Sequence, residues 1–479
     1  MNQNSTMKKI TLLLAFGLWA SLAFAQVPKV DYDAQLKIID YWLGAQRDFD
    51  KLPGISVAIV QDQDIIFKRG YGFADVANKV PMKPETIGSI CSISKLFTSV
   101  GVMQLWEKSK LRLDDSLTAL LPEYTINQQF SESVPITVRS MLTHSSGLTR
   151  DVGAGWNGPD FKFITTDELK KKMVNLQTLY PSATYWQYSN LAMSLLGEIV
   201  ASKSGTAYKN YVEENILKPL NLGSTHPYLP ENSWKTGEMA KGYGGLNRQG
   251  ERKLLPFFNP NALTPAAGFS SNVIDLAKFA SWQFRLLSSS KAEVLRPSTL
   301  KEMQRIQWTS PDKKITWGLG FYIQFQTSGL TTFGHDGGCP GYVSSVMIDP
   351  KKKIGVSVLI NAPADVYKYS DQIFTILNKE FTADTSTQKI DLSEYEGRYD
   401  VSDWGGEAII IPVKGKLIMM TVPTTTTIDF REFKYIRKDV FRLIRDDDKT
   451  LGEELVFERD GKGKIINTRS FFFKNDKID

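Results

Sequence analysis

The segment from Ser92 to Trp106 constrains the fold more than any other, because it is apolar on nearly every side of a helix. Its apolar positions are Leu96, Phe97, Val100, Val102, Met103, Leu105 and Trp106. A helix without a polar face is buried on all sides, so other elements must surround it. The chain has 479 residues, which is long for one hydrophobic core, and we expect at least two structural units.

The elements around this helix follow a simple order along the chain. A helical pattern comes first, a β-hairpin follows, short helices and loops fill the middle, and strands return near the end of this region. The expected segments are a helix over 32–49, a hairpin over 54–73, helices and loops over 114–287, and strands over 320–325, 331–334, 343–348 and 354–360. This order predicts an α+β fold: one antiparallel sheet flanked by terminal helices, with an all-helical lobe beside it.

The region after Leu392 has a different character. Nearly every segment alternates apolar and polar residues, and hairpin signals stand at 414–415 and 460–463. The expected strands are 408–413, 416–422, 455–458 and 465–473. We therefore predict a small antiparallel β-barrel or sandwich over 390–479, after a main domain over 26–382.

Residues 1–25 predict a secretory signal peptide. Lys8 and Lys9 precede an apolar run over 10–24, and Ala23-Phe24-Ala25 forms a small-residue cleavage site. The alternative is a membrane anchor, but a span needs roughly 20 apolar residues and this run is shorter. We expect secretion across the inner membrane to a periplasmic or extracellular location, with no later transmembrane segment.

Charge and composition exclude several classes of partner. The net charge of +6 is a mild bias, and no run of Lys and Arg has the interleaved aromatic residues of a nucleic-acid groove. Histidines do not pair with carboxylates at metal-ligand spacing, so we expect neither a metal nor another cofactor. The sequence leaves the oligomeric state open.

The buried helix begins with Ser92-Ile93-Ser94-Lys95. The Ser-x-x-Lys pattern recurs at other places in the chain, but only here does it open an apolar helix. The Ser92 hydroxyl then faces the positive end of the helix dipole, and Lys95 lies on the same helix face within reach of it. A serine needs a neighbouring base to become a nucleophile, and burial lowers the pKa of a lysine toward that use.

Two further motifs supply complementary groups. Tyr188-Ser189-Asn190 offers a phenol that can act as a base only beside a cation such as Lys95. The second motif is His335-Asp336-Gly337-Gly338, whose glycines allow a strand edge to approach a substrate closely. The backbone N–H groups of Ser92 and Gly338 would then form an oxyanion hole.

The order and surroundings of these motifs resemble the serine β-lactamase-like family over residues 35–375. This family includes class C β-lactamases, penicillin-binding D-alanyl-D-alanine carboxypeptidases, D-aminopeptidases and esterases. Supporting phrases stand at 142–148, 265–269 and 317–321. The resemblance implies that Ser92 is acylated, that Lys95 and Tyr188 share proton transfer, and that Asn190 bonds the lysine and the substrate. Which of the two is the base stays open.

The chain departs from the family at residues 335–337. β-Lactamases usually carry Lys-Thr-Gly there, which binds a substrate carboxylate, whereas His335 is mostly neutral at pH 7 and Asp336 would repel an anion. We expect His335, Gly337 and Gly338 to bind substrate. Asp336 either favours a substrate amine or points away from the cleft, since strand neighbours alternate.

Cys91 precedes the expected nucleophile and Cys339 follows Gly338. If both motifs line one cleft, the two sulfurs are close, and an oxidising compartment favours a disulfide over two separate thiols. Class A carbapenemases are bridged at similar positions.

These observations lead to a ranked set of functions. An exported serine hydrolase acting on D-amino acid or cell-wall-derived peptides comes first, a carboxylesterase second and a weak β-lactamase third. The alternative of another class is an inactive or slow penicillin- or peptidoglycan-binding protein. The expected ligand is a small molecule or peptide. The terminal β-unit caps the cleft, binds a cell-wall component or only stabilises the chain.

Overall fold

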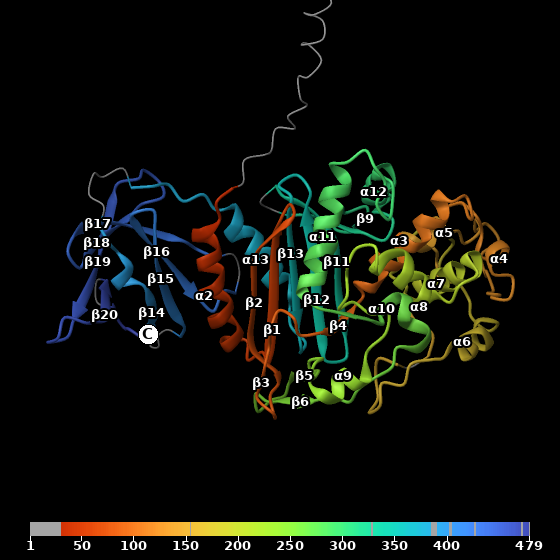
Figure 1. The fold of residues 1–479 in the computed structure, drawn as a ribbon, viewed down its shortest axis with the longest axis horizontal. Coiled ribbons are helices and arrows are strands. Elements are labelled where there is room, and N and C mark those ends of the chain that lie inside the picture. Colours follow the sequence, from red (N-terminus) through yellow and green to blue (C-terminus); the bar gives the residue numbers. More distant parts are fainter. Residues whose placement is uncertain are drawn as a thin grey trace, which may run out of the picture.

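The computed structural model describes residues 30–478 except 154, 327–328, 385–389, 402–404, 426–427 and 471–472. The expected signal peptide lies outside these residues. A nine-stranded sheet, in the order β3-β2-β1-β13-β12-β11-β10-β9-β8, forms the centre (Figure 1). Its strands are β1 (Gly54–Gln61), β2 (Asp64–Asp75), β3 (Val80–Pro81), β8 (Trp308–Thr309), β9 (Thr316–Trp317), β10 (Tyr322–Phe325), β11 (Thr331–Cys339), β12 (Tyr342–Asp349) and β13 (Ile354–Ile360).

Helices cover both faces of this sheet (Figure 1). Strand β1 is buried along its whole length, and its side chains divide between two cores. Ile55, Val57 and Ile59 pack toward the terminal helices α2 (Asp33–Phe49) and α13 (Val366–Asn378). The alternate residues Ala58 and Val60 join the core that contains α11 (Val273–Leu287). The hydrophobic run of β1 therefore reflects burial on two faces.

The helical lobe lies beyond α11 and surrounds α3 (Ser94–Glu107). Its other helices are α4 (Leu117–Leu120), α5 (Val138–Leu142), α6 (Thr166–Met173), α7 (Asn190–Ser204), α8 (Tyr208–Val212), α9 (Glu231–Thr236), α10 (Thr264–Ala267) and α12 (Pro297–Gln304). Two small sheets complete the domain: β4 (Gly88–Cys91) with β7 (Phe269–Ser271), and β5 (Tyr243–Leu246) with β6 (Arg252–Leu254). Residues 94–105 of α3 are all buried, so the expectation from its apolar pattern is confirmed.

The C-terminal unit is a near-closed, eight-stranded antiparallel barrel, which resolves the choice between barrel and sandwich. Its strands are β14 (Gly397–Asp400), β15 (Glu407–Val413), β16 (Lys416–Val422), β17 (Arg431–Arg437), β18 (Val440–Ile444), β19 (Leu451–Arg459), β20 (Ile465–Ser470) and β21 (Phe473–Asp476). A bridge between Tyr399 and Lys477 joins the first strand to the end of the last. The single strand expected over 465–473 is wrong, because β20 and β21 pair antiparallel there.

The barrel docks on the far side of α2 from the sheet (Figure 1). Ile410 and Leu417 fill its interior, whereas Ile409 and Ile418 join the core beneath α2, so both strands alternate. The Trp42 indole of α2 donates a hydrogen bond to the Thr424 hydroxyl at 3.1 Å. An apolar outer face of the barrel thus completes the cover of α2. The boundaries 26–382 and 390–479 stay a prediction.

Candidate active site

Ser92 lies at the turn between β4 and α3, where the chain changes direction sharply. Cys91, directly before it, adopts the left-handed conformation with φ of +49°, which few non-glycine residues tolerate. Strand β11 packs closely against β4 here. A Cβ at Gly337 would lie 2.3 Å from the Ile90 carbonyl oxygen, so only glycine fits. Gly337 therefore brings β11 against β4, while Gly338 lines the cleft; the binding of a substrate by these glycines stays a prediction.

Lys95 is fully buried directly beside Ser92. Its Nζ donates to three acceptors: Ser92 Oγ at 3.1 Å, Asn190 Oδ1 at 2.7 Å and the Ala266 carbonyl oxygen at 2.8 Å. Burial holds the pKa of Lys95 well below its ordinary value, and the nearby Arg150 guanidinium lowers it further. These three contacts fix the amine beside Ser92, whereas burial is what lowers its pKa and favours the neutral form.

Tyr188 shares a hydrogen bond with the Ser92 side chain. The Lys95 Nζ is 4.7 Å from the centre of the Tyr188 ring, and the Arg150 guanidinium is 5.0 Å from it. Desolvation nevertheless raises the pKa of Tyr188 above its ordinary value, although the bond to Ser92 lowers it. The phenol of Tyr188 is therefore protonated at neutral pH in this arrangement.

The sheet side of the site carries His335 and Asp336. Burial lowers the pKa of His335 to about 4, so the ring is neutral at pH 7. The ring packs against Trp317, with centroids 5.5 Å apart. Asp336 lines the cleft and accepts a hydrogen bond from the Tyr367 hydroxyl at 2.7 Å. The alternative that Asp336 points away from the cleft is wrong.

A cleft of about 530 Å³ lies over Ser92. The wall on the side of the helical lobe, here called the helical wall, consists of the loop residues Arg150, Trp186, Gln187 and Tyr188. The wall on the side of the sheet, here called the sheet wall, consists of Ile315, Trp317, Tyr322, Asp336, Gly338 and, from α13, Tyr367. Strand β10 pairs with β11 only as far as Gly334, which leaves the β11 edge from His335 onward facing the cleft region. The described residues that line this cleft all precede the barrel, so no described part of the barrel caps it.

Three contributors to the site carried no motif in the sequence. Asp151 accepts a hydrogen bond from Asn190 Nδ2 at 2.9 Å, and the adjacent Arg150 lines the cleft. The Ala266 carbonyl, which bonds Lys95, belongs to a phrase noted only for its resemblance to the family. Backbone acceptors and loop carboxylates follow no spacing rule, so a sequence pattern does not identify them. The only sequence signal was that a buried Lys95 and Asn190 each need further hydrogen-bond partners.

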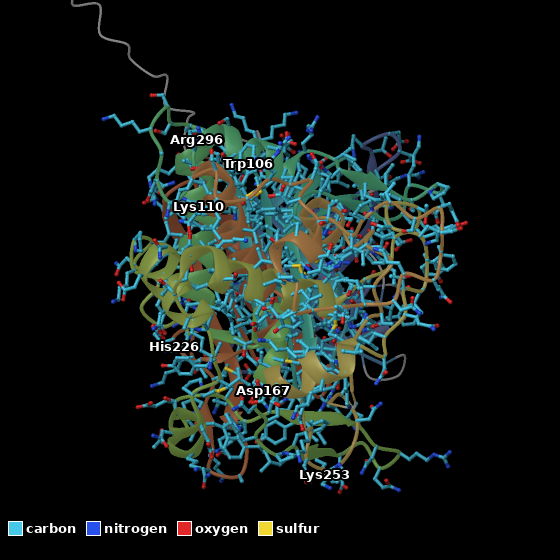
Figure 2. All side chains as sticks on the ribbon, turned by 90° about the vertical axis from the view of Figure 1, so that its right-hand side faces the viewer. Trp106, Lys110, Asp167, His226, Lys253 and Arg296 are labelled. Carbon is cyan, nitrogen blue, oxygen red and sulfur yellow. A yellow bond between two sulfur atoms is a disulfide. The ribbon has the colours of Figure 1, made fainter. Side chains whose placement is uncertain are left out.

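The other two histidines lie outside the bonded group around Ser92. His144 is buried, and its Nδ1 accepts the Ser189 N–H at 3.1 Å, in agreement with a structural role. Its ring packs on Tyr188 with centroids 4.4 Å apart. His226 lies at the periphery of the molecule (Figure 2) and forms a backbone bridge to Ser270.

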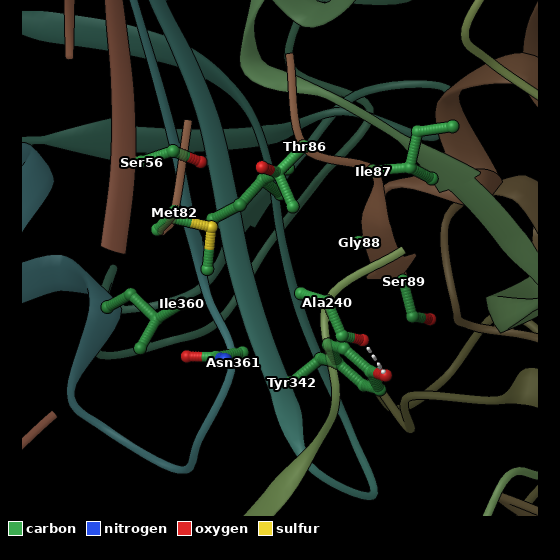
Figure 3. Close-up of a pocket in the computed structure, with 11 residues that line it drawn as sticks. Ser56, Met82, Thr86, Ile87, Gly88, Ser89, Ala240, Tyr342, Ile360 and Asn361 are labelled. Atoms are coloured by element: carbon green, nitrogen blue, oxygen red, sulfur yellow. Dashed lines mark hydrogen bonds between the residues drawn. The ribbon is translucent and has the colours of Figure 1, made fainter. Parts of the chain in front are cut away.

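Cys91 and Cys339 form a disulfide, with Cα atoms 5.7 Å apart. The bond links β4 to β11 directly beside Ser92. Behind it, a small cavity of about 10 Å³ lies between β4 and the sheet (Figure 3). Ser89 lines this cavity, and its Oγ lies 3.2 Å from Cys339 Sγ. The space suits one water molecule and no substrate.

The described residues contain no cluster of three or more His, Cys, Asp or Glu side chains arranged to hold a metal ion. Within the same part of the chain, no helix has the length and apolar character needed to cross a membrane.

The sheet, the lobe and the terminal barrel define a β-lactamase/transpeptidase fold with an appended barrel. The family model described as "Beta-lactamase" matches residues 44–373, and the chain belongs to this family. Its members are typically serine hydrolases.

Individual relatives are distant. Protein Flp of Staphylococcus aureus (strain COL) is 24% identical over 367 residues, which cover 74% of this chain and 69% of Flp. The octameric penicillin-binding protein homologue from Pyrococcus abyssi has a TM-score of 0.63 at 24% identity, covering 94% of this chain and all of that one (100%). A D-stereospecific amidohydrolase from Streptomyces sp. has a TM-score of 0.58 at 23% identity, covering 72% and 99%. These structural likenesses show the fold alone.

Proposed function

We propose that the chain is a serine hydrolase that forms an acyl-enzyme at Ser92 and cleaves amide bonds of D-amino acid derivatives or cell-wall-derived peptides. The observation that carries this proposal is the contact of a fully buried lysine amine with the Ser92 hydroxyl at 3.1 Å. A buried lysine is costly to a fold unless it is bonded or used. Here all three of its contacts hold it at the serine.

The two pKa directions support a division of labour between Lys95 and Tyr188. Neutral Lys95 would accept the Ser92 proton as Oγ attacks the substrate carbonyl, and the N–H groups of Ser92 and Gly338 would stabilise the oxyanion. Protonated Tyr188 would donate its proton to the departing amine, and the proton on Lys95 would restore it. Water would then cleave the acyl-enzyme and release the acid.

The sheet wall supports the choice of an amine-bearing substrate. Asp336 places a carboxylate in the cleft, where β-lactamases place a group that binds an anion. His335 is neutral, so it supplies no cation to offset that charge. A substrate ammonium would donate a charge-assisted hydrogen bond to the Asp336 carboxylate. The fold likeness to a D-stereospecific amidohydrolase agrees with this substrate class.

The first test compares the mature protein from Gln26 with Ser92→Ala on a short p-nitrophenyl ester. We expect the variant to lose about 10³-fold or more in kcat/KM, because the nucleophile is absent. Equal rates, or no turnover in either protein, would favour the binding-protein alternative.

The second part of this test addresses the substrate. We expect D-alanine p-nitroanilide to be cleaved faster than its L-isomer and its N-acetyl derivative. Asp336→Asn should lower kcat/KM about 10- to 100-fold for the free amine only, since one charged hydrogen bond contributes about 1.5–3 kcal/mol. Equal losses on the free and acetylated substrates would contradict the role of Asp336.

We also propose that residues 1–25 direct export to the periplasm or the medium. The Cys91–Cys339 disulfide supports this location, because disulfides persist in oxidising compartments. Intact mass of the isolated protein should begin at Gln26, and a mass that retains residues 1–25 would contradict cleavage.

A further inference from the structure

The loop Thr149–Asp151 is held against the start of α7 by main-chain contacts. The Ser189 hydroxyl donates to the Thr149 carbonyl oxygen at 2.7 Å, and the Asn190 N–H donates to the Arg150 carbonyl oxygen at 2.8 Å. Asp151 therefore has a fixed place beside Asn190. The Asp151 side chain is only 14% exposed. Its Oδ2 also lies 3.4 Å from Nε of the Arg150 guanidinium.

The Asn190 amide connects Asp151 to Lys95. Asn190 Nδ2 donates to Asp151 Oδ1 at 2.9 Å, and Asn190 Oδ1 accepts from Lys95 Nζ at 2.7 Å. An ionised carboxylate only accepts hydrogen bonds, so it selects the NH₂ end of the amide. A rotated amide would place oxygen against carboxylate and NH₂ against the amine. Asp151 therefore determines which end of Asn190 faces Lys95.

We propose that Asp151 is a positioning residue of the active site: through the Asn190 amide, its carboxylate fixes the oxygen that holds the Lys95 amine beside Ser92. The inference rests on the proposed function of Ser92 and Lys95. It adds a residue outside the three motifs and assigns it two separable effects, one of geometry and one of charge.

The charge effect follows from the surroundings of Lys95. The charged and titratable groups that face it are Asp151 and Arg150 from the loop, Asp336 and His335 from β11, His144 from the helical lobe, and Tyr188. Burial lowers the pKa of Lys95 most, Asp151 and Asp336 raise it, and Arg150 lowers it. The neighbouring loop residues Asp151 and Arg150 thus shift the pKa of Lys95 in opposite directions.

Three substitutions separate geometry from charge. Asp151→Asn keeps an acceptor for Asn190 and removes the charge, Asp151→Ala removes both, and Arg150→Gln removes the opposing charge. Asp167→Asn is the matched control, because Asp167 is exposed on α6, away from the cleft lining (Figure 2). The measurement is the pH dependence of kcat/KM on the p-nitrophenyl ester, whose acid limb reports the base of the free enzyme.

We expect the acid limb to move to lower pH in Asp151→Asn, since loss of the negative charge lowers the pKa of Lys95. In Arg150→Gln it should move to higher pH, and in Asp167→Asn it should stay in place. Asp151→Ala should also lose about 10- to 100-fold in kcat, because a misplaced base weakens catalysis. An unmoved limb in Asp151→Asn, shifts of one sign in both loop variants, or wild-type kcat in Asp151→Ala would overturn the proposal.

A second readout does not need turnover. The ¹³Cε resonance of Lys95, assigned by its absence in Lys95→Met, reports the titration of the amine directly. We expect a lower pKa in Asp151→Asn than in wild type, and an unchanged titration would overturn the proposal. If wild type shows no Ser92-dependent hydrolysis, the proposed function fails, while this titration still decides the role of Asp151.

Discussion

The helical wall and the sheet wall of the cleft use their polar groups differently. On the side of the helical wall, both Lys95 and Tyr188 form hydrogen bonds to Ser92 itself. On the sheet wall, Asp336 is bonded to Tyr367 of the same wall and presents its carboxylate to the cleft. We infer that the helical side prepares the nucleophile and the sheet side selects the substrate. Substitutions on the helical side should therefore reduce all hydrolysis, whereas those on the sheet side should change which substrate is preferred.

The largest expected effect tests the helical side. Lys95→Met preserves an unbranched side chain and removes the amine, so we expect kcat/KM on the p-nitrophenyl ester to fall about 10³-fold, as for loss of a general base. The same loss should appear with every substrate. Thermal unfolding should show a folded variant, since burying methionine leaves no charged group to desolvate.

The matched control for this prediction is Lys218→Met. Lys218 is an exposed lysine paired with Glu214 on the surface, and its loss should leave the rate unchanged. A fall of less than tenfold in kcat/KM for Lys95→Met would show that Tyr188 is a sufficient base. The proton acceptor on the helical side would then be Tyr188 and not Lys95.

The two walls also differ in how far the sequence predicts them. The buried helix, the hairpin and the late strands are in place, and Ser92, in the turn that leads into α3, meets Lys95 in the first turn of that helix. Local periodicity is enough for such features, because residues three apart on a helix are always neighbours. The disulfide was also predictable, since both cysteines adjoin residues of one cleft.

The remaining features depend on tertiary contacts. Strand alternation left the direction of Asp336 open, and the hydroxyl of Tyr367 on a distant helix accounts for its place in the cleft. Asp151 reaches Lys95 only through Asn190, across segments far apart in the chain. The Ala266 carbonyl is a backbone group, and every residue type has one, so the sequence does not indicate its role. Such contacts arise from how loops pack, and periodicity contains no information on that.

The disulfide provides the next test, because it ties β4 at the base of the helical side to the sheet wall. Replacing both cysteines in Cys91→Ser/Cys339→Ser opens a link between residues 248 positions apart. We expect the free energy of unfolding in urea to fall by about 4 kcal/mol, mainly through a less constrained unfolded chain.

Catalysis should suffer less than stability in this double variant. Gly337 packs against Ile90 without help from the sulfurs, so the walls keep their separation. We expect ester hydrolysis at 25 °C to stay within about tenfold of wild type, as for a change that leaves the reacting groups in place. A much larger loss would show that the bond, rather than packing, holds the walls together. Alkylation of two thiols in the folded wild type would contradict the bridge.

The smallest expected effect concerns the charge of the sheet wall. The pKa of His335 is lowered to about 4, mainly by burial, whereas an unfolded histidine has a pKa of about 6.5. Below pH 6.5 the unfolded chain therefore binds a proton that the folded chain does not. Stability from this residue is present above pH 6.5 and falls as the pH drops toward 4, by about 3 kcal/mol in total.

The measurement is urea unfolding of wild type and His335→Asn at pH 7.5 and pH 4.5. The wild type should lose about 2.5 kcal/mol more than the variant between these pH values, by the same linkage. His226→Asn is the control and should show a smaller difference: burial lowers the pKa of His226 too, but this residue is only half-buried, and Glu213 and Asp275 oppose the shift. Equal pH dependence in wild type and His335→Asn would mean that His335 is as readily protonated in the fold as in the unfolded chain. The sheet wall would then gain a cation below neutral pH, and a substrate carboxylate would become an acceptable ligand beside Asp336.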